Sequence, residues 1–182
     1  DKPKLTNNFV NKFKKNRIGI APFAYYKSKS LPVLLIKKLI SQLSLNPKNS
    51  ILIFGGGKGE RVILEKLSKD YSNVHSLVQK FSFEEELDII SNLDLMISAD
   101  SANGHIATMY KVPVITIWGL THPCLGFTPF NQPAINQILP DLKKYPLIPT
   151  SVYGKSYPKK YLNCFSTIAV EKILSTVSIY IE

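Results

Sequence analysis

The chain has 182 residues, of which 45% are hydrophobic and 20% are charged, a composition that is ordinary for a globular protein with one substantial core. No apolar run approaches the length of about 18 residues that a membrane-spanning helix needs, and no signal-peptide pattern is present. The two cysteines, Cys124 and Cys164, have neither metal-site spacing nor a disulfide framework, which favours reduced thiols in a cytosolic protein.

The net charge is +10, from 23 basic and 13 acidic residues, and Arg17 and Arg61 are the only arginines. This lysine excess favours an anionic partner, namely a nucleotide, a nucleic acid or an anionic lipid, although a solvated lysine-rich surface has the same composition. The sequence has no arginine-rich run and no aromatic and glycine signature of single-strand binding, which argues against nucleic acid. Because the chain begins at Asp1 rather than Met, we expect a fragment or a trimmed chain.

The first part of the chain predicts two strand–helix units. Residues 1–16 are polar and lysine-rich, and they predict a linker or a short leading helix. Pro32 suits the first turn of a helix with apolar side chains at helical spacing, namely Leu35, Ile36, Leu39, Ile40 and Leu43. The elements expected in order are strand 17–21, loop 22–31, helix 32–45, strand 50–54, glycine-rich turn 55–60, and a helix to about residue 68 with Val62, Ile63 and Leu67 on its inner face.

The second part predicts two further strand–helix units and then an irregular region. Ser82 and Glu85 form a capping box, and Val112-Pro113 stops the helix before the last predicted strand. The elements expected in order are a weak edge strand 74–78, helix 82–92, strand 93–97, helix 102–110 and strand 114–118. Residues 119–161 hold seven prolines and predict a long irregular excursion, and Ser166 could cap a terminal helix over 166–181.

Strands that alternate with helices predict an α/β fold, a Rossmann-like doubly wound domain with a mostly parallel sheet over residues 17–182. The loops 22–31, 55–60 and 98–105 each follow a strand, so all three lie at the carboxyl edge of that sheet. In open parallel sheets ligands bind at this edge. The convergence of the three loops is therefore the main reason to expect a binding site.

The helix that starts near Ser101 offers unpaired N–H groups and a positive dipole end, which suit a phosphate. His105 lies about one turn into this helix, so its ring could lean back over the helix start, or it could be a core histidine. Asp100 would repel a phosphate, so it could instead cap the helix or orient a lysine or a hydroxyl.

The turn Gly55–Glu60 is neither a dinucleotide fingerprint nor a Walker A loop. Its glycines would let the backbone approach a ligand closely, and Glu60 could accept hydrogen bonds from ribose hydroxyls. The alternative is a tight turn with Glu60 stabilised in the helix's first turn.

Lys27 and Lys29 could offer charge to a diphosphate, or could simply be solvated. The sequence has no Ser/His/Asp triad, no metal-spaced histidines and no pair of catalytic carboxylates, so it favours binding over catalysis and no metal.

Four motifs in order resemble glycosyltransferase family 9, the lipopolysaccharide heptosyltransferases and their relatives. They are Ile20-Ala21-Pro22 with Lys29-Ser30-Leu31-Pro32, Gly56-Gly57-Lys58-Gly59-Glu60, Asp100-Ser101-Ala102-Asn103-Gly104-His105, and Val112-Pro113 with Gly119-Leu120-Thr121-His122-Pro123. The resemblance covers roughly residues 17–135. Ala102 and Lys111 each stand where the family usually has glycine.

The resemblance implies one half of a GT-B enzyme, which has two Rossmann-like domains with a cleft between them. This chain would be the carboxyl-terminal domain that binds the nucleotide sugar, typically ADP-L-glycero-D-manno-heptose. The family's motifs then imply that Lys29 pairs with the diphosphate or sugar, that Gly56, Gly57 and Glu60 hold the ribose side, and that Thr121 lies near the cleft. The residues expected along the diphosphate are Asp100, Ser101, Ala102 and His105.

The family's catalytic base is an acidic residue of the amino-terminal domain, so the resemblance implies no catalytic base in this fragment. Transfer would invert the anomeric carbon, and Lys29 and His105 would stabilise the leaving diphosphate without a metal or other cofactor. The expected partners are a nucleotide sugar, a lipid-linked saccharide acceptor and the missing domain, in a cytoplasmic bacterial enzyme whose basic surface could contact the anionic inner membrane. The alternative is a non-catalytic module that binds anions or nucleic acid, with strongly salt-dependent binding.

Overall fold

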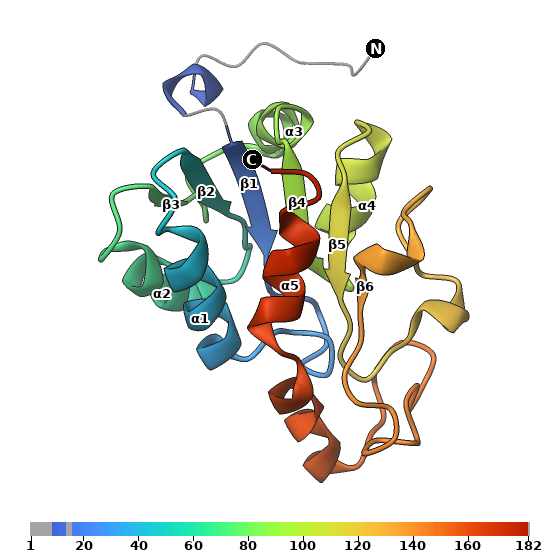
Figure 1. The fold of residues 1–182 in the computed structure, drawn as a ribbon. Coiled ribbons are helices and arrows are strands. Elements are labelled where there is room, and N and C mark those ends of the chain that lie inside the picture. The colour runs from blue at the N-terminus through green and yellow to red at the C-terminus, as the bar shows by residue number, and fades with distance from the viewer. Residues whose placement is uncertain (1–8, 14–15, 182) are drawn as a thin grey trace.

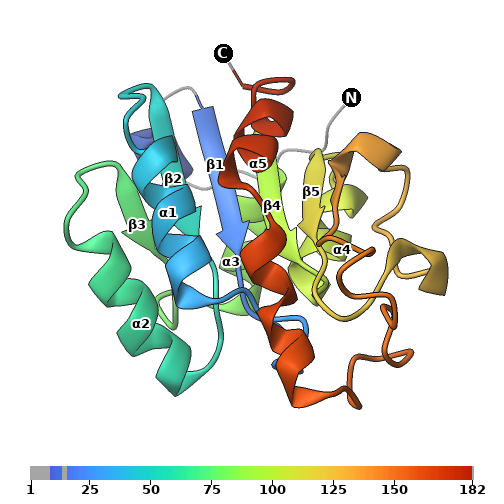
Figure 2. The ribbon, with the colours of Figure 1, turned by 60° about the horizontal axis from the view of Figure 1, so that its bottom comes forward.

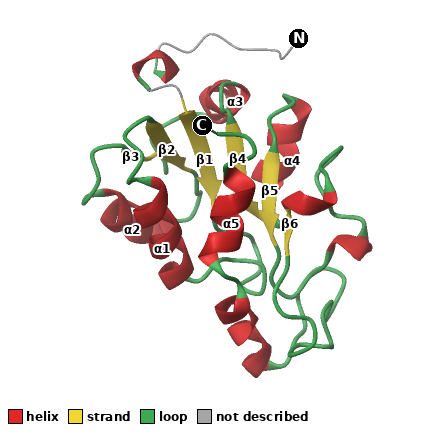
Figure 3. Cartoon of the chain, in the orientation of Figure 1, coloured by secondary structure: helices red, strands yellow, loops and turns green. Residues whose placement is uncertain are grey.

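A computed structural model describes residues 9–13 and 16–181, and within them the chain forms one six-stranded parallel sheet with helices on both faces (Figures 1 and 3). The strands are β1 (Asn16–Ala21), β2 (Asn49–Ile53), β3 (Val74–Ser76), β4 (Leu95–Ala99), β5 (Val114–Ile117) and β6 (Gln137–Ile138). The helices are α1 (Val33–Leu43), α2 (Lys58–Ser68), α3 (Phe83–Ser91), α4 (Ala102–Met109) and α5 (Val170–Val177). Short 3₁₀ segments are η1 (Val10–Lys12), η2 (Pro123–Leu125), η3 (Ala134–Asn136) and η4 (Lys159–Thr167).

The strand order is β3-β2-β1-β4-β5-β6, and every neighbouring pair is parallel. The chain therefore winds outward in one direction from β1 and then crosses to β4 to wind outward in the other. This is the order of the dinucleotide-binding doubly wound fold, in which the switch point lies between the two central strands. The predicted Rossmann-like, doubly wound parallel sheet is confirmed.

The helices form a layer on each face of the sheet. Helices α1, α2 and α5 cover one face, and α3 and α4 cover the other (Figure 2). The predicted apolar stripe of α1 is confirmed, because all five of its members are buried: Leu35, Ile36, Leu39, Ile40 and Leu43. Strands β2, β4 and β5 are buried along their whole length, as expected of apolar strands covered on both faces.

The predicted inner face of α2 is wrong in its phase. Leu64 is fully buried, whereas Val62 is 69% exposed and Ile63 and Leu67 are half-buried. Because residues 62–64 are all apolar, the sequence fits more than one helix rotation, and the packing of Leu64 against the sheet selects one of them.

The carboxyl-terminal third contains more regular structure than its sequence suggests. Strand β6 lies within the excursion 119–161 and pairs with β5 through Thr116↔Gln137 and Ile117↔Ile138. Ser166 does not cap the terminal helix; it lies in η4 and its hydroxyl donates to the Asn163 carbonyl. Helix α5 begins only at Val170, with Ala169 at the N-cap, and ends at Val177 rather than 181.

The leading segment is also shorter than predicted, because β1 begins at Asn16 and the 3₁₀ turn η1 precedes it. Most of the predicted linker, residues 1–8 and 14–15, lies outside the described residues. Among the residues that are described, no helix is long and apolar enough to cross a membrane.

Candidate functional site

The loops that follow β1, β2, β4 and β5 meet at the carboxyl edge of the sheet, the lower edge in Figure 1. Loop 22–31 reaches across this edge, since the Leu120 amide donates to the Ser28 carbonyl at 3.0 Å and Lys29 pairs with Asp100. Residues from the ends of β1, β4 and β5 are thereby brought together, as the sequence predicts for the loops after β1 and β4.

The centre of this edge is an ion pair between Lys29 and Asp100. The Lys29 Nζ lies 2.8 Å from Asp100 Oδ2, and the two side chains are only 13% and 4% exposed. Thr121 Oγ1 donates to the same carboxylate oxygen at 2.8 Å. Of the two roles predicted for Asp100, the structure supports the one in which it orients a lysine and a hydroxyl.

Lys29 is held by its surroundings rather than left in solvent. Its Nζ lies 5.5 Å from the centre of the Phe127 ring, within the range of a cation–π contact. An ammonium has three donors, and among the described residues Asp100 is the ion-pair partner that takes one of them. The remaining hydrogens can face an anionic ligand. Lys27, the other lysine predicted in this loop, is exposed.

Helix α4 begins directly beside the ion pair, and Ser101 is its N-cap residue. Within the described part of the chain no side chain caps this helix, and the Ser101 hydroxyl instead lies 3.1 Å from Ser98 Oγ. The first amides of α4, from exposed Ala102 onward, are therefore available to an anion. His105 in the first turn is exposed, which rules out the alternative of a core histidine.

The glycine-rich turn after β2 forms the far end of the same edge. Gly57 is the N-cap of α2, and Glu60 Oε2 accepts from the amides of Gly56 and Gly57 at 2.9 and 3.1 Å. The structural alternative for Glu60, a carboxylate that stabilises the helix start, is therefore present. Both hydrogen bonds fall on one oxygen, so Oε1 can still accept from a ligand.

Sequence reasoning missed a turn formed by residues 150–154, which we name the closing turn. It is tied to the site because Ser28 Oγ donates to the Gly154 carbonyl and the Thr150 amide donates to the Leu120 carbonyl at 3.0 Å. Gly154 has a φ of +76°, and a Cβ at this position would lie 2.5 Å from Ser28 Oγ, so only glycine fits. The glycine itself is the signal that could have indicated a tight turn.

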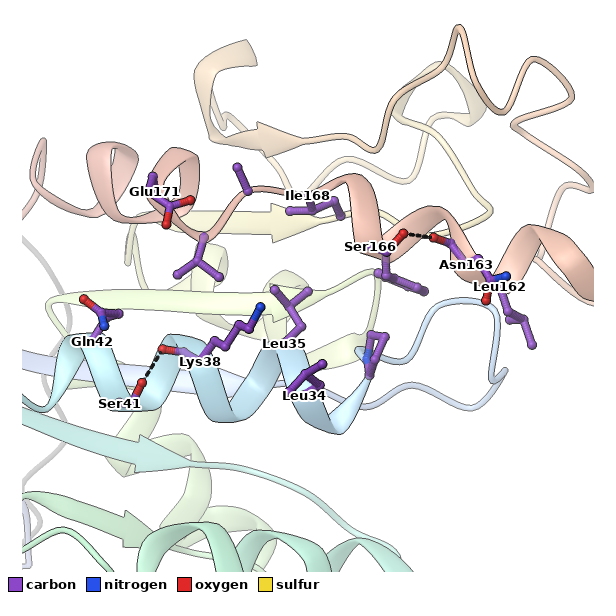
Figure 4. A pocket seen from close by; sticks show the side chains of 14 residues that line it. Leu34, Leu35, Lys38, Ser41, Gln42, Leu162, Asn163, Ser166, Ile168 and Glu171 are labelled. Atoms are coloured by element: carbon purple, nitrogen blue, oxygen red, sulfur yellow. Dashed lines mark hydrogen bonds between the residues drawn. The ribbon is translucent and has the colours of Figure 1, made fainter.

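A groove of about 760 Å³ lies elsewhere, between α1 and the segment from η4 to α5 (Figure 4). Leu35, Leu162 and Ile168 form part of its apolar wall, and Lys38 and Glu171 lie along it. None of the predicted site residues lines this groove. The candidate site is an open sheet edge, and among the described residues no cluster of three or more His, Cys, Asp or Glu side chains could hold a metal ion.

A doubly wound parallel sheet with a lysine, an uncapped helix start and a glycine-rich turn at its carboxyl edge is a Rossmann-like α/β domain with an anion-accepting corner. The chain belongs to glycosyltransferase family 9 (heptosyltransferase), whose family model matches residues 2–156. The resemblance inferred from the four motifs is confirmed.

Two curated relatives are lipooligosaccharide heptosyltransferase 2 proteins from Campylobacter jejuni. The one from strain 81116 is 27% identical over 181 residues, which are 97% of this chain and 55% of the relative. The one from strain ATCC 700819 is 26% identical over 178 residues, 95% of this chain and 53% of the relative. The chain thus spans about half the length of the curated relatives that it matches.

Solved structures share the fold at low sequence identity. A family 9 glycosyltransferase from Veillonella parvula superposes with a TM-score of 0.69 at 16% identity, over 97% of this chain and 47% of that chain. Escherichia coli heptosyltransferase WaaC with ADP-2-deoxy-2-fluoro heptose gives a TM-score of 0.67 at 17% identity, over 92% of this chain and 44% of that chain.

Proposed function

We propose that this chain is the donor-binding domain of an inverting glycosyltransferase that transfers heptose from ADP-heptose to a lipopolysaccharide core acceptor. The observation that carries the proposal is the Lys29–Asp100 ion pair, 2.8 Å long and nearly buried, beside the uncapped start of α4. A positive charge and free helix amides at the switch point of a parallel sheet suit the diphosphate of a nucleotide sugar.

Each candidate residue has a distinct part in this proposal. Lys29 and the first amides of α4, from Ser101 and Ala102, take the diphosphate together with His105, which is exposed in the first turn of the same helix. Glu60 takes the ribose through Oε1, and Gly56 and Gly57 let the backbone approach the nucleoside closely. Asp100 and Thr121 hold Lys29 in place from beneath, so Asp100 need not touch the phosphates.

The choice of donor and acceptor is supported by the relatives. The curated relatives are named lipooligosaccharide heptosyltransferases, and the E. coli structure of this fold holds an ADP-heptose analogue. We propose that the base which deprotonates the acceptor lies in the part of the family's proteins that this chain does not span. Lys29 and His105 then stabilise the diphosphate as the bond to the anomeric carbon breaks, without a metal.

Under this proposal the enzyme works in the cytoplasm. Its net charge of +10 attracts it to the anionic inner face of the membrane, which carries the lipid-linked acceptor. The non-catalytic alternative, a module that binds nucleic acid, has the same charge in its favour. It predicts binding to oligonucleotides that weakens steeply as salt rises, and no preference for ADP.

Calorimetric titration with ADP, UDP and GDP at moderate salt tests the proposal. The chain has one continuous sheet with a buried core on each face, so binding can be measured on it directly. We expect selective ADP binding that weakens at least about tenfold in Lys29→Ala and in His105→Ala, because each removes a group that faces the diphosphate. Lys37→Ala and Met109→Ala are matched controls, since both side chains are exposed on α1 and α4 away from this edge.

Unchanged ADP affinity in both site variants would refute the proposed donor site. Oligonucleotide binding that exceeds ADP binding and falls steeply with salt would support the nucleic-acid module instead.

A further inference from the structure

The groups at the carboxyl edge lie in a fixed order across the sheet. Reading from one side, Glu60 follows β2, Lys29 follows β1, Asp100 and Ser101 follow β4, and Thr121 follows β5. Lys29 and Thr121 both reach Asp100 Oδ2, so these three groups meet at one point, while Glu60 comes from the β2 side of the sheet, away from β4 and β5. A long ligand that contacts Glu60 with one end must lie across the strand ends in this order.

An aromatic pair comes from the part of the chain that follows β5. Phe127 follows η2 after β5, and its ring centre lies 5.7 Å from that of Tyr153, with 39° between the ring planes. The Phe127 ring also faces the Lys29 ammonium at 5.5 Å. Tyr153 is 61% exposed although it is a large aromatic side chain, so the pair presents a ring surface to whatever occupies the edge.

We propose that Phe127 and Tyr153 form the subsite for the sugar ring of the donor; this rests on the proposed function. A nucleotide sugar is linear, with nucleoside, diphosphate and sugar in sequence. With the nucleoside at Glu60 beside β2 and the diphosphate at Lys29 and α4 between β1 and β4, the sugar falls beside β5. Phe127 comes from the loop after β5, and its ring lies 5.5 Å from the ammonium of the lysine that would neutralise the adjoining phosphate.

The chemistry of the pair suits a sugar ring. One face of a pyranose presents C–H groups whose hydrogens carry partial positive charge, and the face of an aromatic ring is electronegative. Stacking of the two buries apolar area while the sugar hydroxyls stay in water. The nearby Lys29 cation strengthens the preference for a ligand with a negative charge beside its sugar, which a free sugar lacks.

The closing turn fixes Tyr153 relative to Lys29. Ser28, the neighbour of Lys29 in sequence, donates to the carbonyl of Gly154, the neighbour of Tyr153. The Thr150 amide adds a hydrogen bond to the Leu120 carbonyl, one residue before Thr121. The loop that carries Lys29 and the turn that carries Tyr153 are therefore joined by hydrogen bonds, which hold the proposed sugar and phosphate subsites next to each other.

The experiment compares the affinities of ADP and ADP-heptose for the chain and its Tyr153→Ala and Phe127→Leu variants. We expect ADP-heptose to bind about five- to tenfold more weakly to Tyr153→Ala, from the loss of ring stacking, while ADP binds within about twofold of the unmodified chain. Phe127→Leu also removes the ring that faces Lys29, so it should weaken ADP binding as well, but ADP-heptose binding by a larger factor. Tyr153→Phe keeps the ring and should restore ADP-heptose affinity. Phe83→Ala is the matched control, because Phe83 is a similarly exposed aromatic residue on α3.

A variant that loses ADP and ADP-heptose affinity by the same factor would overturn the sugar subsite, and so would Tyr153→Ala and Phe127→Leu variants that bind both ligands normally. Failure of the proposed function is a different result, in which the unmodified chain binds neither ligand. Circular dichroism and thermal unfolding of each variant separate lost stacking from lost folding.

Discussion

Thr121 and Lys29 meet at a single atom: the Thr121 hydroxyl and the Lys29 ammonium each lie 2.8 Å from Asp100 Oδ2. Thr121 comes from the loop after β5 and Lys29 from the loop after β1, and the carboxylate between them follows β4. A hydroxyl that fixes the carboxylate also fixes the lysine paired with it. The positive charge at the site is thus oriented before any ligand arrives.

Removing the Thr121 hydroxyl should weaken ligand binding through Lys29. In Thr121→Val, Asp100 loses a donor and Lys29 its fixed orientation, so we expect ADP affinity to fall about threefold and the free energy of unfolding to fall by about 1 kcal/mol. Thr121→Ser keeps the hydroxyl and should bind ADP like the unmodified chain, although the loss of a buried methyl group lowers its free energy of unfolding. Calorimetry measures the ADP affinity and urea unfolding measures the stability. A Thr121→Val variant that binds ADP normally would show that the Thr121 hydroxyl does not contribute to ligand binding.

Glu60 should matter for a nucleoside but not for a bare diphosphate. Glu60→Ala removes the carboxylate that accepts from the Gly56 and Gly57 amides, so we expect the free energy of unfolding to fall by about 1 kcal/mol. ADP affinity should drop several-fold, while inorganic pyrophosphate, which has no ribose, should bind as before. Equal losses for ADP and pyrophosphate would mean that Glu60 acts only by holding the glycine-rich turn.

The fold and the centre of the site could be predicted from the sequence because their signals are local. Apolar strands, the capping box at Ser82 and the stop at Pro113 each act within a few residues, and parallel topology then places every strand-end loop at one edge. The phase of α2 was ambiguous because Val62, Ile63 and Leu64 are consecutive apolar residues, and only packing chooses among them.

The closing turn and β6 could not be predicted, for a different physical reason. Ser28 and Gly154 are 126 residues apart, and nothing in either local sequence specifies their hydrogen bond. Strand β6 has only two residues, Gln137 and Ile138, too few for an alternating pattern to be recognised. The aromatic pair was missed with them, since Tyr153 reaches the edge only through the closing turn.

The two cysteines should differ sharply in reactivity. Burial raises the pKa of the Cys164 thiol to about 12, so it stays protonated and unreactive at neutral pH, whereas Cys124 is exposed. We expect a thiol reagent at about pH 8 to modify one cysteine of the folded chain, and both in denaturant, because unfolding removes the burial. Mass spectrometry of digested protein identifies the site, and rapid labelling of Cys164 in the folded chain would contradict its burial.

His75 should make the chain less stable in mild acid. Burial, with the Lys80 ammonium as a second cause, lowers the pKa of the His75 imidazole from 6.5. The unfolded chain therefore takes up this proton at a higher pH than the folded chain. The contribution of His75 to the free energy of unfolding is thus fully present above about pH 6.5 and is lost as the pH falls. We expect the free energy of unfolding to fall between about pH 7.5 and 5.5, and to fall less in His75→Gln.

The comparison with His75→Gln is needed because other groups titrate in an adjacent pH range. Burial raises the pKa of the Glu86 carboxyl from 4.5, so this group takes up its proton first in the folded state and opposes the loss of stability at lower pH. Both proteins contain Glu86. The difference between the pH dependences of their free energies of unfolding is therefore the contribution of the His75 imidazole. Identical slopes would mean that His75 does not resist protonation.

The sheet ends on both sides in short strands, three residues in β3 and two in β6. An edge strand recruits a further strand through its row of unpaired amides and carbonyls, and strands this short offer few of them. Lengthening of the sheet by another chain, as in edge-to-edge aggregation, is thereby disfavoured on either side. Short edges therefore favour assembly of this domain through its helices and strand-end loops over assembly through added β-structure.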